Sequence, residues 1–216
     1  MTKQYTQNEE IINASTHAIG IVLVVVSGIV LMKRAIAGGD AWAIATVPLY
    51  LIGAFSSYLA STWYHATTHE ARKAKLRKFD HSAIYLHIAG TYSPVALVLL
   101  RETGYWGWGL FCFVWLCATV GLIFSVTNLK GHSHFETACF VAMGCSIFIA
   151  FKPLIDVVSP QGMMNIVWWI LAGGAAYIIG ALFYSWRKMK YMHGAFHVFC
   201  LLGSICHIIA IYYVIR

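Results

Sequence analysis

The sequence predicts an all-α, polytopic membrane protein, a bundle of seven transmembrane helices. Hydrophobic residues make up 60% of the 216-residue chain and charged residues 11%, whereas soluble domains carry about 25% charged residues. A helix needs roughly 20 apolar residues to cross the hydrocarbon core, so the chain has room for about seven crossings joined by short loops. No separate soluble domain fits, and residues 1–216 are expected to form one integral membrane domain.

The apolar runs predict seven helices in order along the chain, at about residues 14–35, 43–65, 80–100, 105–127, 134–156, 163–186 and 192–214. A short polar segment, residues 1–12, precedes the first helix, and its acidic pair Glu9–Glu10 argues against a cleaved signal peptide. The fifth run is the weakest candidate for a helix, because Lys152, Pro153 and Asp156 lie at its end. Glycines at helical spacing are expected to allow close helix packing. They are Gly20, Gly28, Gly173, Gly174 and Gly180.

Lysine and arginine predict the orientation, because short cytoplasmic loops carry an excess of both. With the odd-numbered helices running outward, the side that holds the N-terminus carries two thirds of the cations. They are Lys3, Arg72, Lys73, Lys75, Arg77, Lys78, Lys130, Arg187, Lys188 and Lys190. The sequence therefore predicts a cytoplasmic N-terminus and an external C-terminus. The net charge of +7 is accounted for by loops that face a membrane surface, without a nucleic-acid partner.

Histidines, rather than cysteines, form the candidate metal site. The six cysteines lie inside apolar runs without a CxxC pair and are expected to serve helix packing. "HGAFH" (193–197) places two imidazoles one helical turn apart, a pair that suits zinc, although among ten histidines chance or packing explains it as readily. His65 supplies a third nitrogen at the same membrane depth, and Ser61, one turn earlier, could hydrogen-bond the site. Three histidines with one open position are typical of catalytic zinc.

Asp80 is the acid expected beside these histidines, because it opens the third helix on the same side of the membrane. It could be a fourth metal ligand, or it could hold and deprotonate a metal-bound water. The alternative is that Asp80 simply caps the helix, since Asp is a favoured N-cap residue. The sequence contains no HExxH, so the familiar zinc-protease arrangement is not expected.

The remaining histidines fall into two groups. His69, His81, His132 and His134 are expected to be loop or interface residues rather than ligands. His17, His87 and His207 lie inside helices. Ionisable residues within a membrane usually face the bundle interior, so these three are expected to line a cavity beside the site.

Four sequence blocks carry a family resemblance. They are "EEIINASTHAIG" (9–20), "SSYLASTWYH" (56–65), "KFDHSAIYLHIAGTYSPVAL" (78–97) and "HGAFHVFCLLGSICHIIAIY" (193–212). In order and spacing they resemble the hemolysin III family, the bacterial branch of the progestin and adipoQ receptor family, which is distantly related to alkaline ceramidases. The resemblance extends from about residue 9 to the C-terminus.

The resemblance implies seven helices in a bacterial inner membrane and one zinc ion near the cytoplasmic face. The ligands implied are His65, His193 and His197, with Ser61 and Asp80 beside the metal. All five positions of this pattern are filled. The resemblance leaves the reaction open, because the related branches include receptors and amide hydrolases.

Three functions follow from these observations. The first is a zinc-dependent membrane hydrolase that cleaves a lipid amide or ester and contributes to membrane lipid homeostasis. In this hydrolase Asp80 deprotonates the attacking water and Ser61 positions the substrate carbonyl. The second is a non-enzymatic lipid sensor or membrane-homeostasis regulator with a structural zinc. The third is a pore lined by His17, His87 and His207. A membrane lipid is the expected partner, and the sequence leaves a homo-oligomer open.

Overall fold

The computed structural model describes residues 5–128, 134–186 and 189–215, and in these ranges every regular element is a helix. The elements are α1 (Gln7–Gly38), α2 (Ala41–Ala66), α3 (Glu70–Pro94), the π-helical turn η1 (Val95–Leu99), α4 (Trp106–Asn128), α5 (His134–Gly144), the 3-10 segment η2 (Cys145–Ala150), α6 (Phe151–Val158), α7 (Met164–Ser185) and α8 (Met192–Val214). They make seven spans that are long and apolar enough to cross a membrane. The predicted all-α architecture is confirmed.

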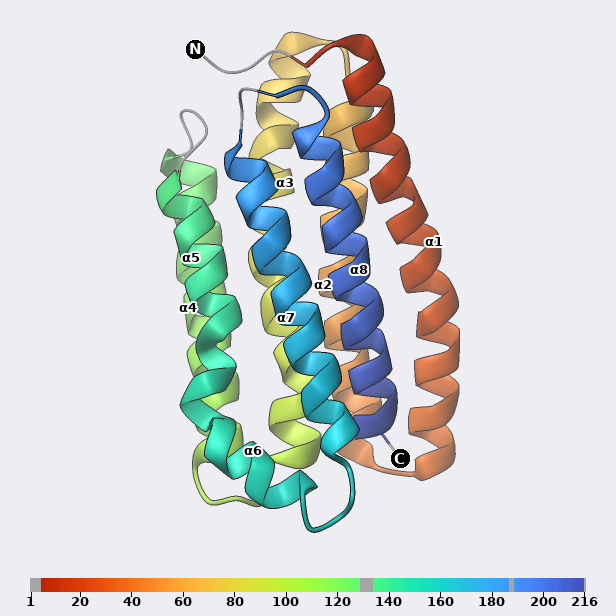
Figure 1. The fold of residues 1–216 in the computed structure, drawn as a ribbon, viewed down its shortest axis with the longest axis vertical. Coiled ribbons are helices and arrows are strands. Elements are labelled where there is room, and N and C mark those ends of the chain that lie inside the picture. The colour runs from red at the N-terminus through yellow and green to blue at the C-terminus, as the bar shows by residue number, and fades with distance from the viewer. Residues whose placement is uncertain (1–4, 129–133, 187–188, 216) are drawn as a thin grey trace.

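The two ends of the chain lie at opposite ends of the bundle (Figure 1), as an odd number of spans requires. The fifth span is the irregular one, because α5, η2 and α6 follow one another and Pro153 lies in α6. The first span begins earlier than predicted. Thr6 caps α1 by a capping box, in which its hydroxyl accepts from the Glu9 N–H while the Glu9 carboxylate accepts from the Thr6 N–H.

The third helix begins at Glu70, ten residues before the predicted start. His69 is its N-cap, with its Nδ1 accepting a long hydrogen bond (3.5 Å) from the Arg72 N–H. The basic stretch between the second and third spans is therefore mostly helix, and only residues 67–69 separate α2 from α3. Asp80 lies inside α3 and does not open it, so the interpretation of Asp80 as a helix cap is wrong.

The backbones of α2 and α3 approach each other closely, at glycines that the sequence did not single out. A Cβ atom on Gly53 would lie 2.4 Å from the Leu86 carbonyl oxygen, and one on Gly90 would lie 2.6 Å from that of Leu49. The glycines that were singled out act differently. Side chains of a neighbouring helix lie against three of them, Gly20, Gly28 and Gly180. The His207 ring and a backbone oxygen lie against Gly173, and nothing lies within 4 Å of the Cβ position of Gly174.

Candidate metal centre

Three histidines converge at the end of the bundle that holds the N-terminus. His65 lies in the last turn of α2, and His193 and His197 lie in the first two turns of α8. One nitrogen from each lies within 4.8 Å of the other two, and Nε2 of His65 is 3.0 Å from Nε2 of His193. His65 and His197 are buried, and His193 is half-buried. This cluster could hold a metal ion.

The neighbours of two of these rings prepare them for a cation. Nδ1 of His65 lies 2.6 Å from a carboxylate oxygen of Glu10, and Nδ1 of His197 lies 3.0 Å from the carbonyl oxygen of Asn13. Both oxygens are acceptors, so each Nδ1 carries the proton and each Nε2 presents a lone pair to the cluster. With the proton on Nδ1, Nε2 is the nitrogen of each ring that can bind a metal.

The spacing also fits a small ion. Zinc binds histidine nitrogen at about 2.0–2.1 Å, so two ligands of a tetrahedral site lie about 3.3 Å apart. The distance of 3.0 Å between Nε2 of His65 and Nε2 of His193 is close to that value. No two of the three nitrogens are more than 4.8 Å apart, so any of these distances needs to shorten by at most about 1.5 Å to reach it. Rotation of the side chains can supply that movement. The donor set therefore fits zinc.

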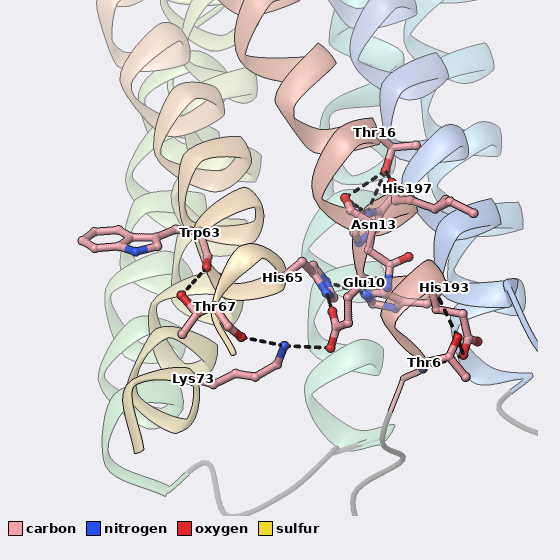
Figure 2. A network of polar contacts seen from close by, with 12 residues as sticks. Thr6, Glu10, Asn13, Thr16, Trp63, His65, Thr67, Lys73, His193 and His197 are labelled. Carbon is pink, nitrogen blue, oxygen red and sulfur yellow. Dashed lines mark hydrogen bonds and ion pairs between the residues drawn. The ribbon is translucent and has the colours of Figure 1, made fainter. Parts of the chain in front are cut away.

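Glu10 is the centre of a network that the sequence did not reveal (Figure 2). One of its carboxylate oxygens contacts His65, and the other lies 2.7 Å from Nζ of Lys73, which also donates to the Thr67 carbonyl oxygen at 3.2 Å. Lys73 was predicted only to set the membrane orientation. It also pairs with the acid that orients a candidate ligand. Glu10 had been noted only for its charge, and its position in the first turn of an apolar helix was the signal that could have identified it.

His17 supports the cluster from the side of α1. Its ring stacks on that of His197 with centroids 3.5 Å apart and an interplanar angle of 13°, and it meets the Tyr58 ring edge-on at 5.2 Å. Together with the Asn13 carbonyl, the stacked ring fixes the plane of His197. His17 is therefore a packing partner of a candidate ligand, in addition to lining the cavity described below.

Asp80 and Ser61 lie beside the cluster but are not members of it. The Ser61 hydroxyl donates a hydrogen bond to the Asp80 carboxylate, which interacts electrostatically with His65 and His81. Both residues line the same cavity as His193 and His197.

That cavity has a volume of about 390 Å³ and extends from the histidine cluster into the bundle between α3, α5, η2, α7 and α8. Its walls are mostly apolar, and His17, His87 and His207 are among the lining residues. The volume lies within the roughly 300–1,000 Å³ that small-molecule sites occupy. An elongated apolar ligand with one polar end matches this shape and lining.

A second buried polar network lies next to Asp80. Nδ1 of His81 on α3 is 2.7 Å from a carboxylate oxygen of Glu136 on α5, and the Ser125 hydroxyl on α4 donates to the other oxygen. Glu136 is 1% exposed. His81, predicted to be a loop or interface residue, is a buried helical residue and not one of the clustered ligands. His132 and the side chain of His134 lie outside the described residues.

The fold and the cluster define a class: a seven-span membrane protein with a cluster of three histidines at one end of the bundle and an apolar cavity that extends from it. A family model described as "Haemolysin-III related" matches residues 5–208, and the chain belongs to this family. It is 37% identical to "Hemolysin-3" of Bacillus cereus, over 94% of this chain and 93% of the relative. It is 36% identical to "Hemolysin-3 homolog" of Bacillus subtilis (strain 168), over 93% of this chain and 91% of the relative. It is 26% identical to "ADIPOR-like receptor IZH1" of Eremothecium gossypii, over 94% and 71%. The family resemblance seen in the sequence is confirmed.

Proposed function

We propose that this protein is a zinc-dependent membrane hydrolase that cleaves a lipid amide or ester. The observation that supports it most directly is the junction of the two features described above: the apolar cavity ends where Ser61, Asp80, His193 and His197 meet. A lipid whose chain fills the cavity would present its polar linkage to these groups. The reaction adds one water across the linkage and releases a fatty acid together with an amine or an alcohol.

Each residue has a defined task in this proposal. His65, His193 and His197 would hold the zinc, which would supply Lewis acidity and lower the pKa of a water toward about 7. Asp80 accepts the proton of the attacking water and returns it to the leaving nitrogen or oxygen. Ser61, whose hydroxyl donates to Asp80, keeps the carboxylate in place and can turn toward the substrate carbonyl. Glu10 orients His65 from behind.

The proposed location is the inner membrane of a bacterium, with the metal site at the cytoplasmic face. The cluster lies at the end of the bundle that also holds the basic first turns of α3. An excess of lysine and arginine at this end favours the cytoplasmic side. A substrate would then be a lipid whose polar linkage reaches the inner leaflet surface.

The proposal is tested with the full chain, purified and reconstituted in lipid nanodiscs. Zinc content is measured by mass spectrometry of the elements, and a panel of ceramides, acyl amides and glycerol esters is assayed for released fatty acid. We expect one zinc per chain and turnover of at least one lipid class, with turnover lost and zinc retained in Asp80→Asn. A zinc-loaded protein that cleaves no lipid in the panel would rule out the hydrolase.

A second function is a lipid sensor in which the metal is structural. The supporting observation is that the cluster and its partners join three helices: His65 belongs to α2, His193 and His197 to α8, and Glu10 to α1. Metal binding would then add to folding stability. In that case His193→Ala lowers the midpoint of thermal unfolding strongly, and Asp80→Asn lowers it less.

A further inference from the structure

Residues of α1 hold two of the three candidate ligands, although α1 supplies none of the three. Glu10 contacts Nδ1 of His65. The Asn13 carbonyl oxygen accepts a hydrogen bond from Nδ1 of His197 (Figure 2), and the His17 ring stacks on the same imidazole. The first three turns of α1 therefore form one wall of the metal centre.

Tyr5, two residues before α1 begins, packs against the third ligand. Its ring centroid lies 5.1 Å from that of His193, with an interplanar angle of 26°, which is a stacked arrangement. Its ring also meets that of His65 edge-on, with centroids 6.0 Å apart. The ring of Tyr184 on α7 lies 5.6 Å from that of His193. Aromatic pairs at these distances attract one another beyond their burial, so they oppose rotation of the His193 side chain.

The segment that carries Tyr5 is anchored to α8 as well as to α1. One carboxylate oxygen of Glu9 accepts from the Thr6 N–H at 3.0 Å, and the other accepts from the Tyr191 N–H at 3.1 Å. Tyr191 directly precedes α8 and has a φ of 62°, a conformation that costs free energy and persists where neighbouring contacts hold it. Glu9 itself is 3% exposed. A buried carboxylate therefore keeps Tyr5 beside the first turn of the helix that carries two of the ligands.

We infer that Tyr5 is a positioning residue of the metal centre, which holds His193 in place and determines how fast the metal is released. Nε2 of His193 faces Nε2 of His65 at 3.0 Å, the orientation in which both can bind one ion. A metal ion leaves when a ligand ring rotates away from it. Rotation of the His193 ring breaks its stack with Tyr5, so the stacked ring prolongs the bound state. The inference rests on the metal of the proposed function and not on the hydrolysis.

Two roles of Tyr5 lead to different expectations for its variants. An anchor for the first turn of α1 needs only apolar bulk, which leucine supplies. A ring that stacks on His193 needs a flat aromatic face, which phenylalanine supplies and leucine does not. Tyr5→Phe and Tyr5→Leu therefore separate positioning of the ligand from simple packing.

The test measures zinc release from the full chain in nanodiscs. Zinc-loaded protein is mixed with an excess of a chromophoric chelator, and the rate of colour formation gives the rate of release. We expect Tyr5→Leu and Tyr5→Ala to release zinc about threefold to tenfold faster than the unmodified chain, the effect of one aromatic contact. Tyr5→Phe should release it at the unmodified rate. Loading with Co²⁺ gives a second readout, because its visible spectrum reports the ligand geometry and should change in Tyr5→Leu but not in Tyr5→Phe.

Tyr105→Ala is the matched control, because it removes the same ring at a site that is 74% exposed, directly before α4 and outside the histidine cluster; it should release zinc at the unmodified rate. Unmodified release from Tyr5→Leu, or release from Tyr5→Phe as fast as from Tyr5→Leu, would overturn the inference. A chain that takes up neither metal would overturn the metal centre and the inference together. Fast release from Tyr5→Leu without any lipid turnover would reject the hydrolase alone, and lipid turnover with unchanged release would reject the inference alone.

Discussion

The carboxylate of Glu10 lies 2.6 Å from Nδ1 of His65, so the first turn of α1 orients a side chain in the last turn of α2. The contact keeps the proton on Nδ1 and directs Nε2 toward His193 (Figure 2). Acids that hold a ligand histidine in this way typically change metal affinity by about 10–100-fold when they are replaced.

Glu10→Gln should therefore weaken zinc binding by about 10–100-fold without abolishing the fold. The amide keeps the size of the side chain but loses the charge that favours the Nδ1–H tautomer. A competition titration against a fluorescent zinc chelator measures the affinity. The control is Glu70→Gln, an exposed acid in the first turn of α3. Equal affinities for the two variants would show that Glu10 does not act through His65.

Replacing a clustered histidine should remove the metal itself. His65→Ala, His193→Ala and His197→Ala are each expected to purify with far less than one zinc per chain, because two nitrogens do not retain a zinc ion against washing. His207→Ala, which removes a histidine from the same cavity but away from the cluster, should keep its zinc. Element analysis of the purified variants gives the comparison. Full zinc content in the three variants would place the metal elsewhere.

The buried Glu136 should matter for stability, because it accepts hydrogen bonds from His81 and Ser125. Glu136→Met keeps the volume and leaves both donors unpaired, at a cost of about 1–3 kcal/mol in the free energy of unfolding. Glu102→Met is the control, since Glu102 is 81% exposed and ion pairs at such sites contribute little. Unfolding by a denaturing detergent, followed by circular dichroism, measures both. An unchanged unfolding curve for Glu136→Met would contradict the network.

Helix contact at Gly53 should tolerate no side chain. Gly53→Ala would bring a methyl group to 2.4 Å from the Leu86 carbonyl oxygen, so α2 and α3 must separate. We expect a loss of more than about 2 kcal/mol, typical of overpacking at a rigid contact. Gly109→Ala, at an exposed helical position with nothing within 4 Å, should be neutral or slightly stabilising, because Ala favours helix over Gly. Similar stabilities for the two variants would argue against the close contact.

The start of α3 shows how a sequence interpretation based on hydropathy can fail. Residues 70–79 were taken as a basic loop because the apolar run begins only after them. Yet "EARKAKLRKF" consists mainly of strong helix formers, and that propensity was the signal for the longer helix. The error did not move Asp80 away from the site, because the extra turns lie beyond the candidate metal centre.

The sequence by itself determined the seven spans and the pairing of His193 with His197, because hydropathy and helical period are local properties of the chain. Only the tertiary structure decided which side chains complete the site. Glu10 meets His65, and Glu136 meets His81, each across 55 residues of chain. Ser204 on α8 meets Tyr58 on α2 and Tyr177 on α7. Such contacts depend on how the helices rotate and approach one another, and no spacing within a single helix records that arrangement.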